Sequence, residues 1–462
     1  MIASKKTISA ALFAAMLMGG VIASPQGAVA QSLEKALSDA YANNPTLGAQ
    51  RARLRAVDEA VPQALSGYRP TVSTEFSVSR TGSESRGSGV RSGSGATPKE
   101  AEATVSQPIY NAQVAPAVRR AESLVQAQRA TLLVTEQQVL LAAATAYVDV
   151  VQNEAVLALT KNNEQVLSRQ LQAAQDRFRV GEYTRTDVAQ SESRLAGAVA
   201  NRMAAEGTLE GSKATYARLM GAEPGKLKAP KPRFKLPANV QSAVSLARGN
   251  NPSVLAASFA EEAAKHAVSQ QFGKLLPSAS LAASASRTYD PGRSNNVELD
   301  WSQSASVTAR VTVPLYQAGL PDSMVREAKQ TANQARIEIE EARRQAVETA
   351  VAAWQSLETA RANIESYRSQ VRAAEIALDG VRQEAQVGSR TVLDVLNQEQ
   401  ELLNGRVNLV RAQRNEMVAA FTLLAAVGQL TAQNLGLKTP VYDPHANYKQ
   451  VRDKWIGTGI GE

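Results

Sequence analysis

The chain has 462 residues, of which 44% are hydrophobic and only 5% are aromatic. This hydrophobic fraction is enough to bury a core and excludes disorder by composition, while so few aromatic residues favour closely packed long helices over a compact enzyme core. The formal net charge is +8, but the charges have mixed sign, as in Glu340-Glu341 beside Arg343-Arg344. Because no basic patch is formed, we exclude nucleic acid as a partner.

The chain has no cysteine and only two histidines, His266 and His445. Without cysteine there is no disulfide, thiolate metal site or cysteine nucleophile. A histidine-based triad or metal site would have to join two residues almost 180 positions apart. The sequence therefore predicts no enzyme, no metal site and no cofactor.

The N-terminus has the pattern of a secretory signal. A basic start precedes an apolar stretch from Ile8 to Met18, and Ala28-Val29-Ala30 matches a small-residue cleavage site. Pro25 interrupts the stretch too early for a transmembrane anchor. We expect residues 1–30 to be a cleaved signal peptide. No later segment has 18 consecutive apolar residues, so the exported chain is expected in the periplasm, outside the cell, or in an outer membrane as a β-barrel.

Two long stretches of the chain match each other at an almost constant spacing. Matches that lie 207 positions apart include Asn43-Asn44-Pro45 with Asn250-Asn251-Pro252, Val180-Gly181 with Val387-Gly388, and Asp187 with Asp394. Agreement at so many residues that begin or end elements indicates a duplicated unit.

Each half has the same order of predicted elements: a helix, two strands, a very long helix, a tight turn and a returning helix. In the first repeat, residues 31–238, the strands span 70–80 and 101–110, the long helix 111–178 and the returning helix 186–220, followed by a proline-rich connector. In the second repeat, residues 239–430, the strands span 277–287 and 297–315, the long helix 318–385 and the returning helix 389–428. Residues 431–462 form a weakly patterned tail, and we expect its end to be partly disordered.

The long helices need a packing partner along their whole length. A helix over residues 111–178 would extend ~100 Å at the usual rise per residue. A helical pattern of such length argues for coiled-coil packing.

The predicted strands alternate between polar and apolar residues. From Val297 to Val313 every even position is polar, and the odd positions are apolar with the exception of Gln303. A water-soluble sheet would show the same alternation. However, four strands of about ten residues have the length that crosses a bilayer, and their ends carry aromatic residues: Tyr68, Tyr110 and Tyr316 on the helix side, Tyr289 and Trp301 on the other.

Four strands cannot close a membrane barrel. The smallest bacterial barrels have about eight strands, and open edges in lipid leave backbone groups without hydrogen bonds. We therefore expect several chains to contribute four strands each, with the helices continuing from the barrel as a tube. The loops between paired strands, Thr81–Lys99 and Thr288–Asn296, are expected on the exterior face.

With these elements in this order, the chain resembles the TolC family of outer-membrane efflux and secretion channels. The resemblance covers about residues 32–430. Its most specific marks are the two Asn-Asn-Pro motifs, Gln107-Pro108-Ile109-Tyr110 with Val313-Pro314-Leu315-Tyr316, and the segment from Val387 to Leu396.

The resemblance implies a mainly α-helical fold with a membrane β part. A homotrimer would form a twelve-stranded transmembrane β-barrel and, from the long helical hairpins, a periplasmic α-barrel. Such a channel performs no chemistry. It contacts outer-membrane lipid, docks on a periplasmic adaptor protein and an inner-membrane pump of unknown type, and passes drugs, small molecules or secreted proteins outward.

The resemblance also implies positions for the functional residues. The polar links that close the periplasmic mouth in the family map to Thr186, Asp187 and Arg390, with Asp394 on the pore-lining ring. This chain departs from the family type member at Ala385, where that protein has a tyrosine, and at Asn397, where it has a second aspartate. The hairpin tips that would contact the adaptor are Val180, Gly181, Val387 and Gly388.

Two other functions compete with the channel. A periplasmic coiled-coil adaptor or scaffold with a soluble sheet would share the helices, but it does not explain four strands of membrane length that end in tyrosines. An exported enzyme would need the nucleophile, histidine or cysteine chemistry that the sequence lacks.

Overall fold

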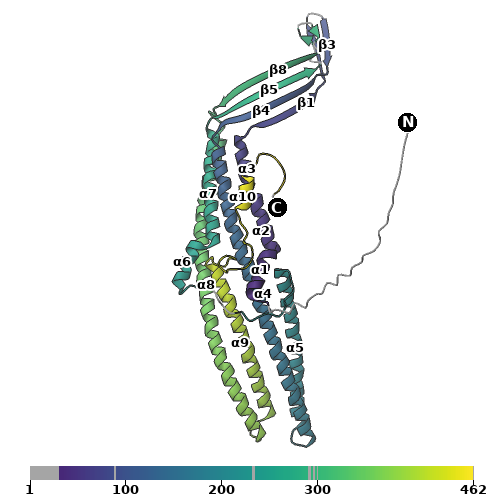
Figure 1. Ribbon diagram of the computed structural model, residues 1–462, viewed down its shortest axis with the longest axis vertical. Helices are drawn as coiled ribbons and strands as arrows, with labels where there is room; N and C mark the ends of the chain where they lie inside the picture. Colours follow the sequence, from purple (N-terminus) through teal and green to yellow (C-terminus); the bar gives the residue numbers. More distant parts are fainter. Residues whose placement is uncertain are drawn as a thin grey trace, which may run out of the picture.

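The computed structural model describes residues 31–87, 90–230, 235–289, 293–294, 297–298 and 300–460. The predicted export signal, residues 1–30, lies outside the described residues. The described chain is an elongated molecule with a sheet at one end and two helical hairpins that run to the other end (Figure 1).

The two halves of the chain have corresponding elements. The first half contains α1 (Leu33–Asn43), α2 (Pro45–Asp58), α3 (Ala60–Leu65), the 3-10 turn η1 (Ser66–Tyr68), β1 (Thr71–Val78), β2 (Thr81–Gly87), β3 (Val90–Ala96), β4 (Lys99–Asn111), α4 (Val114–Arg179) and α5 (Arg185–Met220). The second half contains α6 (Val240–Asn250), α7 (Pro252–Phe272), η2 (Gly273–Leu275), β5 (Ser278–Tyr289), β6 (Arg293–Ser294), β7 (Val297–Glu298), β8 (Trp301–Thr312), α8 (Leu320–Gln386) and α9 (Val392–Ala426), and α10 (Ala446–Val451) follows in the tail.

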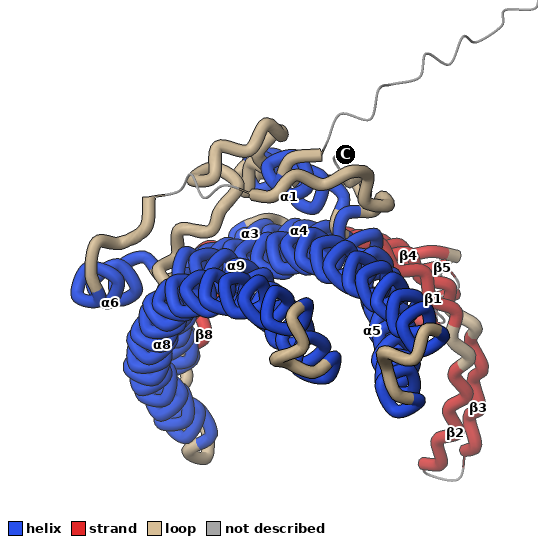
Figure 2. The backbone as a smooth tube through the Cα atoms, turned by 90° about the horizontal axis from the view of Figure 1, so that it is seen from below, coloured by secondary structure: helices blue, strands red, loops and turns tan. Residues whose placement is uncertain are grey.

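The long helices form a curved wall. Seen along its length, the wall is an arc built from α8, α9, α4 and α5, with α1, α6 and the connecting segments on its convex side (Figure 2). The helix α4 packs against α5 over one part of its length and against α2, α3 and α7 over another, while α8 packs against α9 and α7. Each long helix therefore has partners along its whole span, as the sequence requires.

The core of the wall lies where the short helices meet the long ones. The hydroxyl of the buried Tyr147 lies 2.7 Å from the carbonyl oxygen of Lys228 and 2.8 Å from that of Gln31. Burial raises the pKa of the Tyr147 hydroxyl, so it remains protonated and able to donate. An 18-residue stretch of α4 is apolar enough to cross a membrane by length and composition, but the buried Leu140, Ala143 and Tyr147 belong to this core, so we assign the helix to packing.

The second asparagine of each Asn-Asn-Pro motif joins two helices. Asn44 Oδ1 accepts a hydrogen bond from the Thr46 amide (3.0 Å) and caps α2, while its Nδ2 donates to the Leu219 carbonyl (3.2 Å) at the end of α5. In the second half, Asn251 caps α7 through the Ser253 amide (2.9 Å) and donates to the Ala426 carbonyl (3.1 Å) at the end of α9. The motif therefore caps one helix and satisfies the carbonyl end of another.

Three helices precede the sheet where the sequence predicts one, which begins at the Asn44 cap. Asn44 separates α1 from α2, and Glu59 separates α2 from α3. The second break has a simple cause: Pro62 has no N–H to donate to the carbonyl of residue 58 four positions earlier.

The strands form one antiparallel sheet of four, in the order β1-β4-β5-β8. Its polar and apolar faces follow the predicted alternation. Ser284 and Ser306 are hydrogen-bonded across β5 and β8 (3.1 Å), as are Ser286 and Ser304 (2.9 Å), whereas the neighbouring Val307 belongs to the opposite face and is 75% exposed.

The outer loops differ from the prediction. The segment expected as a loop from Thr81 to Lys99 contains the paired strands β2 and β3, which the sequence did not indicate because their serines and glycines show no polar–apolar alternation. The last strand was expected over 297–315, but β8 begins at Trp301, and Val297–Glu298 pairs with Arg293–Ser294 instead. The strand β8 ends at Thr312, shortly before Pro314, which has no N–H to donate to a neighbouring strand.

The tight packing around Gly428, which follows α9, can be tested by substitution. Gly428 has φ +78°, and a Cβ there would lie 2.3 Å from the Asn250 carbonyl oxygen. Gly319 has a similar φ of +77° but no atom within 4 Å of such a Cβ. We expect Gly319→Ala to cost the left-handed penalty of about 1–2 kcal/mol, and Gly428→Ala to cost roughly 1–3 kcal/mol more because it overpacks the junction.

Thermal unfolding of the two variants in detergent, followed by circular dichroism, measures this difference. A lower Tm for Gly428→Ala than for Gly319→Ala is the expected result. Equal Tm values would show that the junction accommodates the added methyl group without loss of stability.

Candidate functional site

The tips of the two hairpins lie at the end of the wall that is far from the sheet (Figure 1). Gly181 closes the turn between α4 and α5 at φ +81°, and Gly388 closes the turn between α8 and α9 at φ +80°. Glycine is required at both positions, since other residues are strained in this conformation. The preceding valines, Val180 and Val387, are 72% and 80% exposed, so each tip presents an apolar side chain to solvent.

Each returning helix begins with a capping box. In the first hairpin the Asp187 amide donates to the Thr184 hydroxyl (3.3 Å), and the Asp187 carboxylate accepts from the Thr184 amide (2.9 Å). Thr391 and Asp394 repeat this arrangement at 3.3 and 3.0 Å in the second hairpin. Both aspartates of the predicted gate therefore stabilise the first turn of their own helix.

The capping box also sets the charge of Asp394. Hydrogen bonds from the Thr391 amide and hydroxyl lower the pKa of the Asp394 carboxyl below its ordinary value. A carboxyl whose pKa is lowered by folding contributes its full stabilisation at pH values above its unfolded-state pKa. This stabilisation is lost as the pH falls through the lowered pKa of the folded state. Asp394 is therefore ionised, and the cap intact, at neutral pH.

Within one chain, Arg390 has a partner in its own hairpin. Its Nε lies 2.8 Å from Oε2 of Glu384, and both side chains are about half exposed. Thr186 is exposed in the first turn of α5. No bond joins Arg390 to Thr186 or Asp187 among the described residues of a single chain. The structure of one chain therefore does not bring the predicted gate residues together.

Other residues join the two hairpins within the chain. Arg194 on α5 donates from Nη2 to Oδ1 of Asn397 on α9 at 2.6 Å. Leu396, the neighbour of Asn397, is buried in a small apolar cluster with Leu167 and Ala198 from the first hairpin. The hairpins thus meet above their tips through an apolar contact and one short polar contact beside it.

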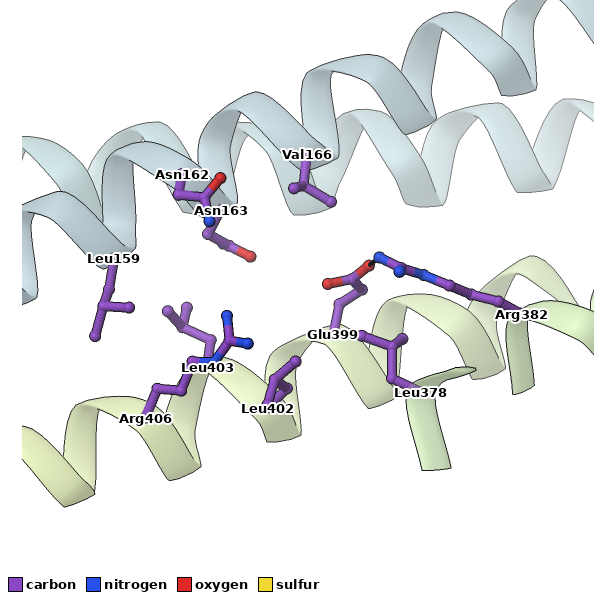
Figure 3. Close-up of a pocket in the computed structure, with 10 residues that line it drawn as sticks. All are labelled: Leu159, Asn162, Asn163, Val166, Leu378, Arg382, Glu399, Leu402, Leu403 and Arg406. Atoms are coloured by element: carbon purple, nitrogen blue, oxygen red, sulfur yellow. Dashed lines mark hydrogen bonds and ion pairs between the residues drawn. The ribbon is translucent and has the colours of Figure 1, made fainter. Parts of the chain in front are cut away.

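A carboxylate is buried next to this contact. Glu399 is only 8% exposed, forms an ion pair with Arg382 of its own hairpin, and accepts a hydrogen bond from Gln170 of the first hairpin (3.4 Å). Figure 3 shows Glu399 and Arg382 directed toward each other at a cleft of about 210 Å³ between α4, α8 and α9. Because the arginine neutralises the buried charge, the carboxylate is tolerated in this position.

Arg194 and Glu399 were not among the site residues predicted from the sequence. Glu399 could have been found, because it lies midway between Leu396 and Leu402 at helical spacing and so interrupts a buried stripe with a charge. Arg194 gave no such signal, since it lies on a half-exposed surface and its partner belongs to the other repeat. Asn397, where the family type member has an aspartate, accepts the hydrogen bond from Arg194.

Known proteins show the same organisation. A sequence profile of the outer membrane efflux protein family matches residues 36–222 and again residues 243–429. The outer membrane efflux protein BepC of Brucella suis biovar 1 (strain 1330) is 36% identical over 452 residues, which cover 96% of this chain and 95% of that protein. The outer membrane protein TolC of Escherichia coli (strain K12) is 24% identical over 418 residues, covering 88% of this chain and 84% of that protein.

A solved structure agrees with the fold. The Campylobacter jejuni CmeC outer membrane channel superposes with a TM-score of 0.77 at 16% identity, covering 91% of this chain and 89% of that chain. The resemblance inferred from the sequence is confirmed, and the two profile matches correspond to the two halves of the duplication. The chain belongs to the outer membrane efflux protein family.

Proposed function

We propose that the chain is the outer-membrane exit duct of a tripartite efflux or type I secretion system. The observation that carries this proposal is an open four-stranded sheet that continues from the end of a curved wall of long helices (Figure 1). The sheet would cross the outer membrane, and the helices would extend into the periplasm after removal of residues 1–30. Cargo would pass through the lumen without a chemical step.

The open sheet supports a homotrimer. Its edge strands, β1 and β8, can be satisfied in lipid only by strands of neighbouring copies. Three copies with four strands each would give a closed barrel of about twelve strands, which exceeds the minimum of about eight strands for bacterial membrane barrels. The same three copies would complete the curved helical wall as a tube.

The tips support docking to a periplasmic adaptor, which would couple the duct to an inner-membrane pump. Val180 and Val387 lie at the two turns, and an exposed apolar tip on a rigid hairpin suits contact with another protein. The rival function, a periplasmic adaptor or scaffold, would leave the open edges of the sheet without partners.

Cell fractionation and cross-linking test this assignment. The protein should stay with the outer membrane after salt and alkaline washes, and cross-linking should yield a trimer. Recovery as a soluble periplasmic monomer would contradict the proposal.

The apolar face of the sheet, which would contact lipid, can be tested by introducing a charge at Val307. Val307→Arg should reduce barrel assembly, because a cation near the bilayer midplane costs roughly 2–4 kcal/mol. Its matched control is Ser306→Arg on the polar face, where Ser306 faces Ser284 and the arginine would reach water in the lumen. The amount of heat-resistant trimer in outer membranes measures both, and equal assembly would show that the assigned faces are wrong.

The contact between hairpins predicts a change in conductance. We assign closure of the mouth to Thr186, Asp187 and Arg390 together with the Arg194–Asn397 hydrogen bond, and we place Asp394 on the pore-lining ring. Arg194→Ala removes that bond, and Arg390→Ala removes the cation proposed to link neighbouring hairpins, so each should raise single-channel conductance in planar bilayers and sensitise cells to large antibiotics.

Lys213→Ala is the control for these two variants. Lys213 pairs with Glu210 one turn away on α5, so its removal changes charge without affecting the tips. Wild-type conductance of Arg194→Ala and Arg390→Ala would show that both arginines are ordinary surface residues.

The twin capping boxes separate a pore role of Asp394 from its structural role. Asp394→Ala and Asp187→Ala remove the same cap from equivalent helices. If three Asp394 carboxylates converge on the axis of a trimer, only Asp394→Ala should weaken block by multivalent cations. Conductance recorded with and without such cations measures this, and equal loss of block in both variants would reduce Asp394 to a helix cap.

A further inference from the structure

The C-terminal tail, residues 428–460, follows the short helices toward the sheet (Figure 1). The Tyr442 amide donates to the Tyr41 hydroxyl (3.1 Å). The guanidinium of Arg51 lies over both rings, 4.7 Å from the centroid of Tyr41 and 5.3 Å from that of Tyr442. Farther along, Asn447 Nδ2 donates to Oδ2 of the buried Asp58 (2.8 Å).

The helix α10 continues this attachment. Tyr448 packs against the apolar cluster that contains Val61 and Val125, and the Arg129 guanidinium lies 5.2 Å from the centroid of its ring. Val451 is buried. These contacts place residues 442–451 of the tail along α2, α3 and α4; the expected disorder concerned only the glycine-rich end beyond them, where residues 461–462 lie outside the described residues.

The end of the tail lies at the helix-side rim of the sheet. Arg69 stands between η1 and β1, and its Nη1 donates to the carbonyl of Lys454 at 2.7 Å. The same guanidinium lies 4.9 Å from the ring centroid of Trp455. Two contacts of one side chain therefore hold the indole beside the first residues of β1.

This end of the tail exposes large apolar side chains. Trp455 is 67% exposed, Ile456 90% and Ile460 91%. Gly457, at φ +106°, turns the chain between them, and Lys454 Nζ donates to the Gly459 carbonyl (2.5 Å) to close the turn. This short loop thus brings together a tryptophan that contacts Arg69 and two isoleucines that are almost fully exposed.

We propose that residues 454–460 are a peripheral anchor in the phospholipid leaflet that faces the periplasm. The proposal rests on the outer-membrane position of the sheet. The loop lies at the rim where β1 begins, and Val72 on β1, 70% exposed, continues the apolar surface into the strand. The occupant is therefore the lipid that surrounds the barrel.

The chemistry of the loop suits the boundary between headgroups and acyl chains. An indole prefers this boundary, because its ring is apolar and its N–H needs a polar partner. Ile456 and Ile460 would enter the acyl region, as on an interfacial segment. Lys454, the first residue of the loop, donates to the Gly459 carbonyl, and the remaining hydrogens of its ammonium group can meet lipid phosphates.

Tryptophan fluorescence can test this, because the chain has three tryptophans in different places. Trp455 is in the loop, Trp301 begins β8 at the opposite rim of the sheet, and Trp354 lies in α8. Three proteins that each retain one of them, with phenylalanine at the other two positions, are reconstituted as full chains into phospholipid vesicles. The acyl chains carry bromine either near the headgroup or near the chain end.

We expect Trp455 to lose most of its fluorescence, with shallow bromine more effective than deep bromine, while Trp354 keeps its signal. Quenching of Trp301 but not Trp455 would overturn the anchor and leave the membrane sheet intact. Failure to quench either would overturn both. Protection of Trp455 from bromine and from aqueous acrylamide would overturn the anchor by showing that protein, from a neighbouring copy or another partner, covers it.

A second comparison separates lipid contact from mere proximity. In the protein that retains only Trp455, Ile456→Ser with Ile460→Ser should reduce quenching, because the loop loses its acyl contacts. Val441→Ser, at an exposed apolar residue elsewhere in the tail, should leave quenching unchanged. Equal quenching in all of these proteins would overturn the role of the isoleucines and with it the anchor.

Discussion

The structure depends on giving each long helix a partner over its whole length. No single returning helix does this, since α4 has 66 residues and α5 only 36. The remaining length is covered by short helices, and Asn44 joins their start to the end of α5 through one buried amide. Asn251 does the same at α9. Without such a junction, the carbonyl end of one helix and the amide end of another would meet without partners.

The junction also explains why the molecule is long and has distinct ends. Above it, the short helices lead into the strands, so the sheet emerges at one end of the wall. Below it, only the hairpins continue, and their turns form the other end (Figure 1). Both halves place their junction at the same point, and the two halves therefore lie side by side in one curved wall.

The sequence contained the repeated parts of this design and not the contacts between them. Asn-Asn-Pro, the turn glycines and the alternation in the last strand are local patterns, and each predicted its element. The strands β2 and β3 were missed because serine and glycine give no alternation, and the break at Glu59 needed the position of Pro62 to be weighed against helical pattern. Arg194 and Asn397 are 203 positions apart, and no period in the chain relates them.

The two ends of the hairpins differ in how firmly they are held. At the junction, buried residues such as Tyr147, Tyr216 and Phe421 form one continuous core. Near the tips, the hairpins share the small cluster around Leu396, the bond from Gln170 to the buried Glu399, and the exposed Arg194–Asn397 hydrogen bond. Exposed polar contacts contribute little each, because water and salt screen them. Local opening therefore requires the least free energy at the tips, and the hairpins can separate there while the junction keeps the wall intact.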